Sequence, residues 1–330
     1  LGARRALSST DLDLEPFVYR LHLDLHSEVN FDNSDVRHRY GGQVVSPEGI
    51  APDVTIELRL NNDATLREQK VTGLKDPTGL RVGTGIFNDP FILQRFSATN
   101  VVAMIVEIPF WQFEGRRDFL IWGTSSQSGR QIDHVGRSLR TMHPRFNFLN
   151  TLKPADHVAA IVKQRDQPGV VQDALATYAS AFAEIRPYDV QPDVMIYSTR
   201  QGEQFQPRYP NGRRLEDDVA KLCCEQGDCL LFEVSQYEAH GAGKRRPETN
   251  GKPFRTEFPW LADPNPDRPA SPPASLRVQT KVIVGVVVVL VAAVFSLPWF
   301  LLWRSQSERA RLRRQIQQFV GPDKIGGGTP

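Results

Sequence analysis

Two histidines and a short acidic run of this 330-residue chain are of residue types that can bind a metal ion. His22 and His26 are four apart, a spacing at which two imidazoles on a helix share one ion. The segment alternates apolar and polar residues, however, and on a strand the two rings stand about 13 Å apart. We therefore predict a polar strand face. Asp32–Asp35 (DNSD) lacks the glycine and terminal glutamate of an EF-hand, which favours an Asx-rich turn.

The three cysteines are the only thiols of the chain, and they lie close together at Cys223, Cys224 and Cys229. In an oxidising compartment, Cys229 would pair with Cys223 or Cys224 and close the loop 225–228, which leaves one cysteine over. Free thiols are a second interpretation. A zinc site that takes His240 as a fourth ligand is a third, although nothing in the spacing favours it.

Motifs of known chemistry are missing from the rest of the chain. It has no nucleophile elbow, phosphate-binding glycine loop, haem attachment motif or HExxH sequence. Forty Lys and Arg against 38 Asp and Glu give a formal net charge of +2, too balanced for a dedicated nucleic-acid-binding protein. We therefore predict a protein that is not an enzyme, with no catalytic residue, no metal ligand and no cofactor.

One segment is typical of a membrane span. Val282–Trp303 carries no charged residue, and as a helix it would cover roughly 33 Å, about the thickness of a bilayer core. We predict a single transmembrane helix here. Small side chains would allow close contact with another helix; they are Gly285, Ala292, Ala293 and Ser296.

The flanks of this span predict its orientation. Residues 263–281 form a Pro-rich linker, and residues 304–330 form a basic tail with six basic and two acidic residues, a net charge of +4. The positive-inside tendency places the tail in the matrix and the large domain in the intermembrane space, or the tail in the cytoplasm and the domain in the periplasm of a bacterium. Residues 1–15 form a processed segment; Leu1–Thr10 has arginines, serines and no acid, as mitochondrial transit peptides do.

Residues 16–262 show the period-two pattern of a β-rich extramembrane domain. Strands are expected at 17–25, 54–60, 194–197 and 230–234, and a buried hairpin from 101–108 and 119–122. A helical period runs from Val171 to Ile185, before Pro187. The fold class predicted is mainly β, a sandwich or distorted barrel with one or two helices, plus the C-terminal transmembrane helix.

Several patches of this domain resemble the bacterial family called domain of unknown function 4331. They are Gly79–Val82, Phe87–Phe91, Asn100–Pro109, Ile121-Trp122, Arg130–Arg137, Tyr209–Val219 and Phe254–Leu261. The resemblance implies a β-rich, generally exported domain without an established activity, so no catalytic residue is carried over. The family's opening motif is not found intact, and the proline linker and membrane anchor are additions.

The most specific patch is Tyr209–Val219, which reads YPNGRRLEDDV. We interpret Asn211-Gly212 as a tight turn. Asp217 and Asp218 would neutralise Arg213 and Arg214 locally, which favours a structural role for the motif over a catalytic one.

The function predicted from these features is a non-catalytic, single-pass accessory or structural subunit of an inner-membrane protein complex, such as a respiratory-chain complex. The mitochondrial inner membrane is preferred, with a bacterial inner membrane as the alternative. The partners expected are other subunits of the complex and the lipid bilayer, and no nucleic acid. The alternative function is a membrane-tethered binding module for a small ligand or metal ion.

Overall fold

The computed structural model describes residues 12–90, 100–113, 115–137, 140–143, 145–170, 173, 184–202, 211–225, 252–266 and 311. The chain divides into two units, residues 1–269 and 270–330. The predicted span 282–303 and its four small residues lie outside the described residues, as does the tail apart from Arg311. Within the described ranges, no helix combines the length and the apolar character that crossing a membrane requires.

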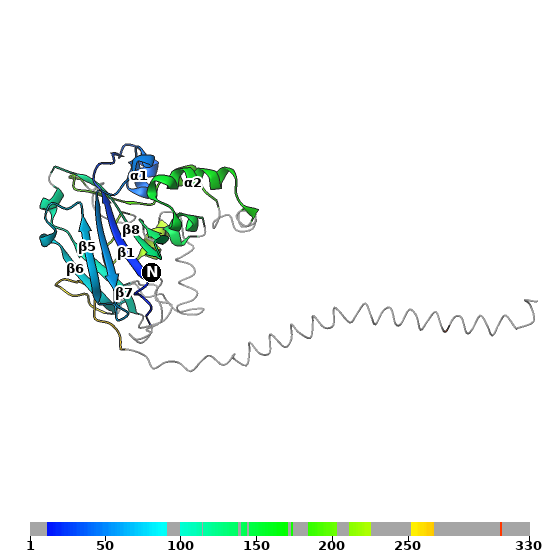
Figure 1. The fold of residues 1–330 in the computed structure, drawn as a ribbon. Coiled ribbons are helices and arrows are strands. Elements are labelled where there is room, and N and C mark those ends of the chain that lie inside the picture. The colour runs from blue at the N-terminus through cyan, green and yellow to red at the C-terminus, as the bar shows by residue number, and fades with distance from the viewer. Residues whose placement is uncertain are drawn as a thin grey trace, which may run out of the picture. The chain divides into compact units, whose positions relative to one another are not determined.

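A six-stranded antiparallel sheet forms the centre of the first unit (Figure 1). Along its main path the strands are β10 (Met195–Ser198), β8 (Asp118–Gln127), β1 (Phe17–Asp24), β4 (Val54–Leu60) and β5 (Leu66–Thr72). The sixth, β9 (Arg130–Val135), pairs with the half of β8 that β10 leaves open. β9 and β10 therefore share one edge of β8.

The alternation of β4 explains the larger apolar core. Val54, Ile56, Leu58 and Leu60 point to one face and are at most 3% exposed. Burial of each such side chain stabilises the folded state by about 1.5–3 kcal/mol relative to leaving it exposed to water. Tyr19 and Leu23 of β1 join the same cluster, because directly paired residues of neighbouring strands share a face.

A separate hairpin packs against this apolar face. It consists of β6 (Arg81–Asn88) and β7 (Asn100–Glu107), and its Val82, Val102 and Met104 contact the core cluster. The prediction that 101–108 and 119–122 form a hairpin was wrong. Each segment is a strand, but β7 pairs with β6, whereas β8 inserts beside β1.

Residues 252–266 are hydrogen-bonded to the end of this hairpin where β6 stops and β7 begins. The amide of Asn88 donates to the carbonyl of Ala262 (3.0 Å), and the Asn100 side chain exchanges hydrogen bonds with the backbone of Asn265. Further along, the Arg81 guanidinium lies 4.4 Å from the centre of the Phe258 ring. The segment therefore runs along the hairpin and brings residues 259–261 beside the core.

The opposite face of the sheet is covered by shorter elements, around a second apolar cluster that includes Leu120, Trp122 and Ile196. The cluster takes in residues of the small sheet of β2 (Val29–Asn30) and β3 (Gln43–Val44). The helices whose bounds fall within the described residues are α1 (Ser34–Tyr40), α2 (Pro154–Asp166) and α5 (Val219–Glu225). The 3-10 turns are η2 (Pro47–Gly49), η3 (Pro77–Gly79), η4 (Phe110–Phe113), η5 (Arg140–Met142), η6 (Asn147–Thr151) and η7 (Pro187–Asp189).

The mainly β class with a few helices is confirmed. The acidic run DNSD serves as a helix start, since Asn33 caps α1 by accepting the amide of Val36 at 3.3 Å. The predicted strand 230–234 and most of the predicted helix 171–185 lie outside the described residues. β5, which the pattern did not predict, exposes nearly every side chain and carries Arg67, Glu68 and Lys70.

Candidate functional site

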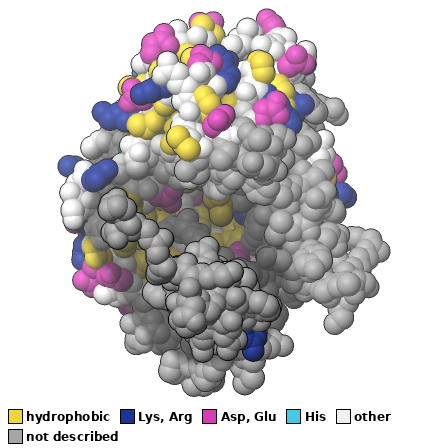
Figure 2. Space-filling view, turned by 90° about the vertical axis from the view of Figure 1, so that its right-hand side faces the viewer, with side chains coloured by type: hydrophobic (Ala, Val, Ile, Leu, Met, Phe, Trp, Pro, Cys, Tyr) yellow, Lys and Arg dark blue, Asp and Glu magenta, His cyan; other side chains and the backbone are white. Residues whose placement is uncertain are grey.

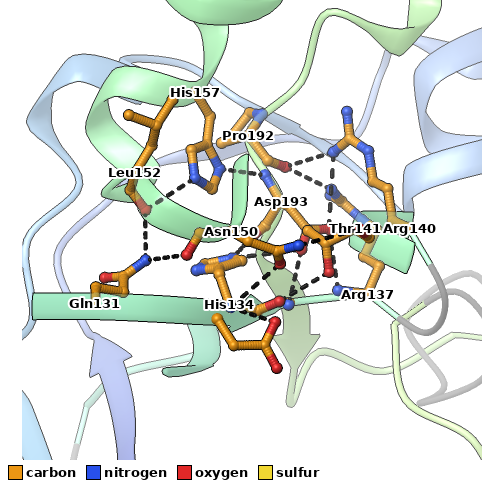
Figure 3. A network of polar contacts seen from close by, with 12 residues as sticks. Gln131, His134, Arg137, Arg140, Thr141, Asn150, Leu152, His157, Pro192 and Asp193 are labelled. Carbon is orange, nitrogen blue, oxygen red and sulfur yellow. Dashed lines mark hydrogen bonds and ion pairs between the residues drawn. The ribbon is translucent and has the colours of Figure 1, made fainter. Parts of the chain in front are cut away.

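A buried polar network lies where β9 and β10 meet on β8, and Asp193 stands at its centre (Figure 3). The Asp193 carboxylate accepts the amides of Gly136 (2.8 Å) and Arg137 (3.1 Å). Its oxygens also lie 3.3 Å from His134 Nε2 and 3.9 Å from Arg140 Nη1. Burial raises the pKa of Asp193, but the His134 hydrogen bond and the positive charge of Arg140 outweigh it and hold that pKa well below its usual range.

His157 of α2 completes the network from above the sheet. Its Nδ1 accepts the amide of Asp193 at 3.1 Å, so its Nε2 carries the proton and donates to the carbonyl of Leu152 at 3.3 Å. This pattern requires a neutral ring. Burial, followed by the charge of His134, lowers the pKa of His157 to about 3, which agrees with the neutral form.

Two arginines tie the network to α1. The Arg137 guanidinium donates to the carbonyls of Pro192 (2.6 Å) and Tyr40 (3.2 Å), and that of Arg140 donates to the carbonyl of Pro192 at 3.0 Å. The centre of the Tyr40 ring lies 4.8 and 4.9 Å from the two guanidinium carbons. The Tyr40 hydroxyl donates to Asp189 at 2.5 Å. The charges are thus satisfied by carbonyls, carboxylates and a ring face.

The network suits a structural role better than a catalytic one. His134, His157 and Asp193 are at most 1% exposed, and their polar atoms are directed at one another and at the neighbouring backbone. At Gly136 an added Cβ would lie 2.2 Å from the Asp193 carbonyl oxygen, which shows how closely the two backbones approach. The network therefore joins β9, β10, α1 and α2, elements that are distant in sequence.

Asn211 of the family-like motif connects the same elements. Its side chain accepts the amide of Ile196 at 3.0 Å and donates to the carbonyl of Tyr40 at 2.9 Å. Gly41 makes room for it, because a Cβ there would collide with the Asn211 amide. Gly212 follows with φ at +89°, the left-handed region that favours glycine.

The charged half of the motif starts helix α5. Asp217 accepts the amide of Arg214 at 2.8 Å, and Asp218 accepts that of Lys221 at 3.2 Å, as a capping residue does. Burial lowers the pKa of Arg213, while the nearby carboxylates of Asp89 and Asp217 act in the opposite direction. These contacts are local and involve backbone, which suits the structural interpretation.

The cysteines are only partly described. Cys224 lies in α5 and is disulfide-bonded. Cys229 and the side chain of Cys223 lie outside the described residues.

His22 lies on the half-buried polar face of β1, and His26 lies beyond the end of that strand. The two His22 nitrogens contact the hydroxyls of Thr55 (3.0 Å) and Thr124 (3.1 Å), and the ring stacks on Trp122. Burial, together with the charge of Arg20, lowers the pKa of His22 to about 4. His26 instead contacts Asp53 at 2.7 Å. Among the described residues, no three His, Cys, Asp or Glu side chains are placed so that they could hold a metal ion.

A cavity of about 640 Å³ is the remaining candidate, a size typical of small-molecule sites. One wall is formed by β1, β4, β8 and β9, and the other by residues 103–106 of β7 and by 259–261. Among the described strands β7 pairs with β6 alone, which leaves its other edge open. Most of the lining side chains are apolar. Figure 2 shows one face of the molecule, with hydrophobic side chains visible in a hollow below a mixed charged surface.

Gly123 of β8 helps to create this space. It pairs with Leu21 and Val135, and all three line the cavity. A Cβ at Gly123 would lie 3.1 Å from Val135, whose side chain is 54% exposed and able to move. Sequence reasoning missed the cavity, since its lining comes from segments far apart in the chain.

Comparison of the chain with protein-family models, with curated proteins and with solved structures finds no match. The resemblance to domain of unknown function 4331 therefore stays a prediction. The patches that carry it supply Gly136, Arg137 and Asn211 to the buried contacts described above.

Proposed function

We propose that this protein is a non-catalytic binding module that holds a small apolar ligand in the cavity between β7 and the main sheet, and that residues 282–303 tether it to a membrane. The observation that carries the proposal is the cavity itself, with its volume of about 640 Å³ and its largely apolar lining. Hydrophobic lining with a few placed polar groups is what small-molecule sites have in common.

The buried polar network supports this proposal indirectly. It fixes β9 against β8 and β10, and β9 supplies Asp133 and Val135 to the cavity wall. A wall fixed in this way keeps a site formed without its ligand, which reduces the cost of ordering it on binding.

The proposal is tested by blocking the cavity. Gly123→Leu places a branched side chain in the space, and Gly49→Leu is the matched control, because no atom lies within 4 Å of a Cβ at Gly49. The full chain, held in lipid nanodiscs, is challenged with a photoreactive, alkyne-tagged apolar probe. We expect labelling of residues 103–106 or 259–261 in the wild type and in the control, and its loss in Gly123→Leu. Labelling that is equal in all three would refute the proposal.

An accessory subunit is the second candidate, and an exposed aromatic pair favours it. Phe110 is 59% and Trp111 49% exposed in η4, and Arg116 and Arg117 follow in the same loop. Aromatic residues and arginine are enriched at protein interfaces. Gentle solubilisation should co-purify partner subunits with the wild type but not with a Phe110→Ser/Trp111→Ser double variant. A wild type that purifies alone would count against this candidate.

A further inference from the structure

The cavity wall carries a short polar row whose members lie on three adjacent strands. Tyr19 of β1 pairs with Ser125 of β8, and Ser125 pairs with Asp133 of β9. Directly paired residues point to the same face, with Cβ atoms about 5 Å apart. All three line the cavity.

Tyr19 and Ser125 are largely buried, but their hydroxyls keep accessible surface at the cavity. Tyr19 is 5% and Ser125 8% exposed. Within the part of the chain that the structure describes, neither hydroxyl makes a hydrogen bond. A hydroxyl that lines a cavity takes its hydrogen-bond partner from whatever occupies the cavity. A ligand with its polar end at this row would supply one.

The charge of the row is negative. One Asp133 oxygen accepts the amide of His134 at 3.0 Å, and the other makes no hydrogen bond to a described residue. Arg20, the one Lys or Arg among the described lining residues, directs its guanidinium to Glu57 (2.9 Å) and Ser126 (3.1 Å). Arg20 and Ser126 neighbour Tyr19 and Ser125 in sequence, so these side chains lie on the opposite face.

We infer that the cavity selects a single-chain amphiphile whose polar end donates hydrogen bonds, a long-chain alcohol or amine, and discriminates against the fatty-acid anion. This rests on the proposed function and adds the class of ligand. The apolar lining takes the chain, the hydroxyls of Tyr19 and Ser125 accept from or donate to the polar end, and Asp133 accepts from it. A carboxylate at the same place meets Asp133 without a cation beside it, and like charges in a site of low polarity repel strongly.

Matched probes in one bilayer test the inference. The full chain in nanodiscs is irradiated with C16 diazirine–alkyne probes that end in an alcohol, an amine or a carboxylate, at equal mole fraction and pH 7.5. Labelling of residues 103–106 and 259–261 is quantified by peptide mass spectrometry. We expect the alcohol and the amine to label at least about tenfold more than the carboxylate, the equivalent of about 1.4 kcal/mol.

Substitutions in the row then identify its members. In Asp133→Asn, carboxylate labelling should rise to within about threefold of the alcohol, and amine labelling should fall. Asp32→Asn, an exposed acid outside the cavity, is the matched control and should match the wild type. Tyr19→Phe and Ser125→Ala should each reduce alcohol labelling several-fold.

The outcomes separate the two proposals. Carboxylate labelling equal to alcohol labelling in the wild type, with both lost in Gly123→Leu, would overturn the inference and leave the binding function standing. An Asp133→Asn variant that keeps the wild-type preference would also overturn it. If no probe labels the cavity peptides, the proposed function falls with the inference.

Discussion

Lowering the pH should reduce the free energy of unfolding through His22. Its ring contacts the hydroxyls of Thr55 and Thr124 and stacks on Trp122. The pKa of this ring falls from 6.5 to about 4 on folding. Because the folded pKa is the lower one, the unfolded chain binds more protons as the pH falls. Stability contributed by neutral His22 is therefore complete above pH 6.5 and is lost progressively toward pH 4.

The size of the effect follows from proton linkage. At pH 5 an unfolded His22 is almost fully protonated and the folded one almost entirely neutral, so this single site lowers the free energy of unfolding by about 2 kcal/mol relative to pH 7.5. His22→Gln removes the titration and keeps a polar side chain. Between pH 7.5 and pH 5, the free energy of unfolding of the variant should therefore fall by about 2 kcal/mol less than that of the wild type.

Pulse proteolysis in urea, on the full chain in mild detergent, measures the free energy of unfolding at both pH values. Thr55→Ser is the matched control, since it keeps the hydroxyl beside the ring and should shift stability equally at pH 7.5 and pH 5. If His22→Gln and the wild type lose the same free energy on acidification, within about 0.5 kcal/mol, the reasoning is refuted.

Three further outcomes are expected. Gly136→Ala should lower the free energy of unfolding by about 3 kcal/mol, because the new Cβ would collide with the Asp193 carbonyl. Gly49→Ala, which adds a Cβ in open space, should leave it nearly unchanged in the same urea assay. Equal effects of the two substitutions would contradict the close approach of the backbones at Gly136. Asn211→Ala should cost about 2 kcal/mol, since it leaves the buried amide of Ile196 unpaired and removes one of the two donors to the Tyr40 carbonyl; an unchanged urea midpoint would contradict this reasoning. The full chain should stay in the membrane pellet through alkaline carbonate extraction, and a variant lacking 282–303 should be released; a full chain in the supernatant would contradict the predicted span.

The strands that alternate clearly were predictable from the sequence. β1 and β4 place an apolar residue at every second position, so their period alone identifies both strand and face. β6 was missed because Gly83 and Gly85 remove side chains from its pattern. Without β6 as a partner, β7 was assigned to β8, the next apolar run along the chain.

The polar contacts were not predictable, because their members are far apart in sequence. His134 and Asp193 meet only when β9 and β10 lie on the same edge of β8. α2 was missed for a related reason, since the residues that it buries include His157, which weakens the apolar period. Single histidines and aspartates carry no spacing signal, so the sequence offered no means of finding this network.

The exposed strand β5 has a consequence for how copies of this protein behave at high local concentration. A bare sheet edge invites the backbone of a neighbouring molecule to add a strand. Here such a neighbour would have to strip water from Arg67, Glu68 and Lys70 while gaining little apolar contact. At high concentration, molecules of this protein should therefore not associate through the β5 edge, and fibre growth from that edge is disfavoured.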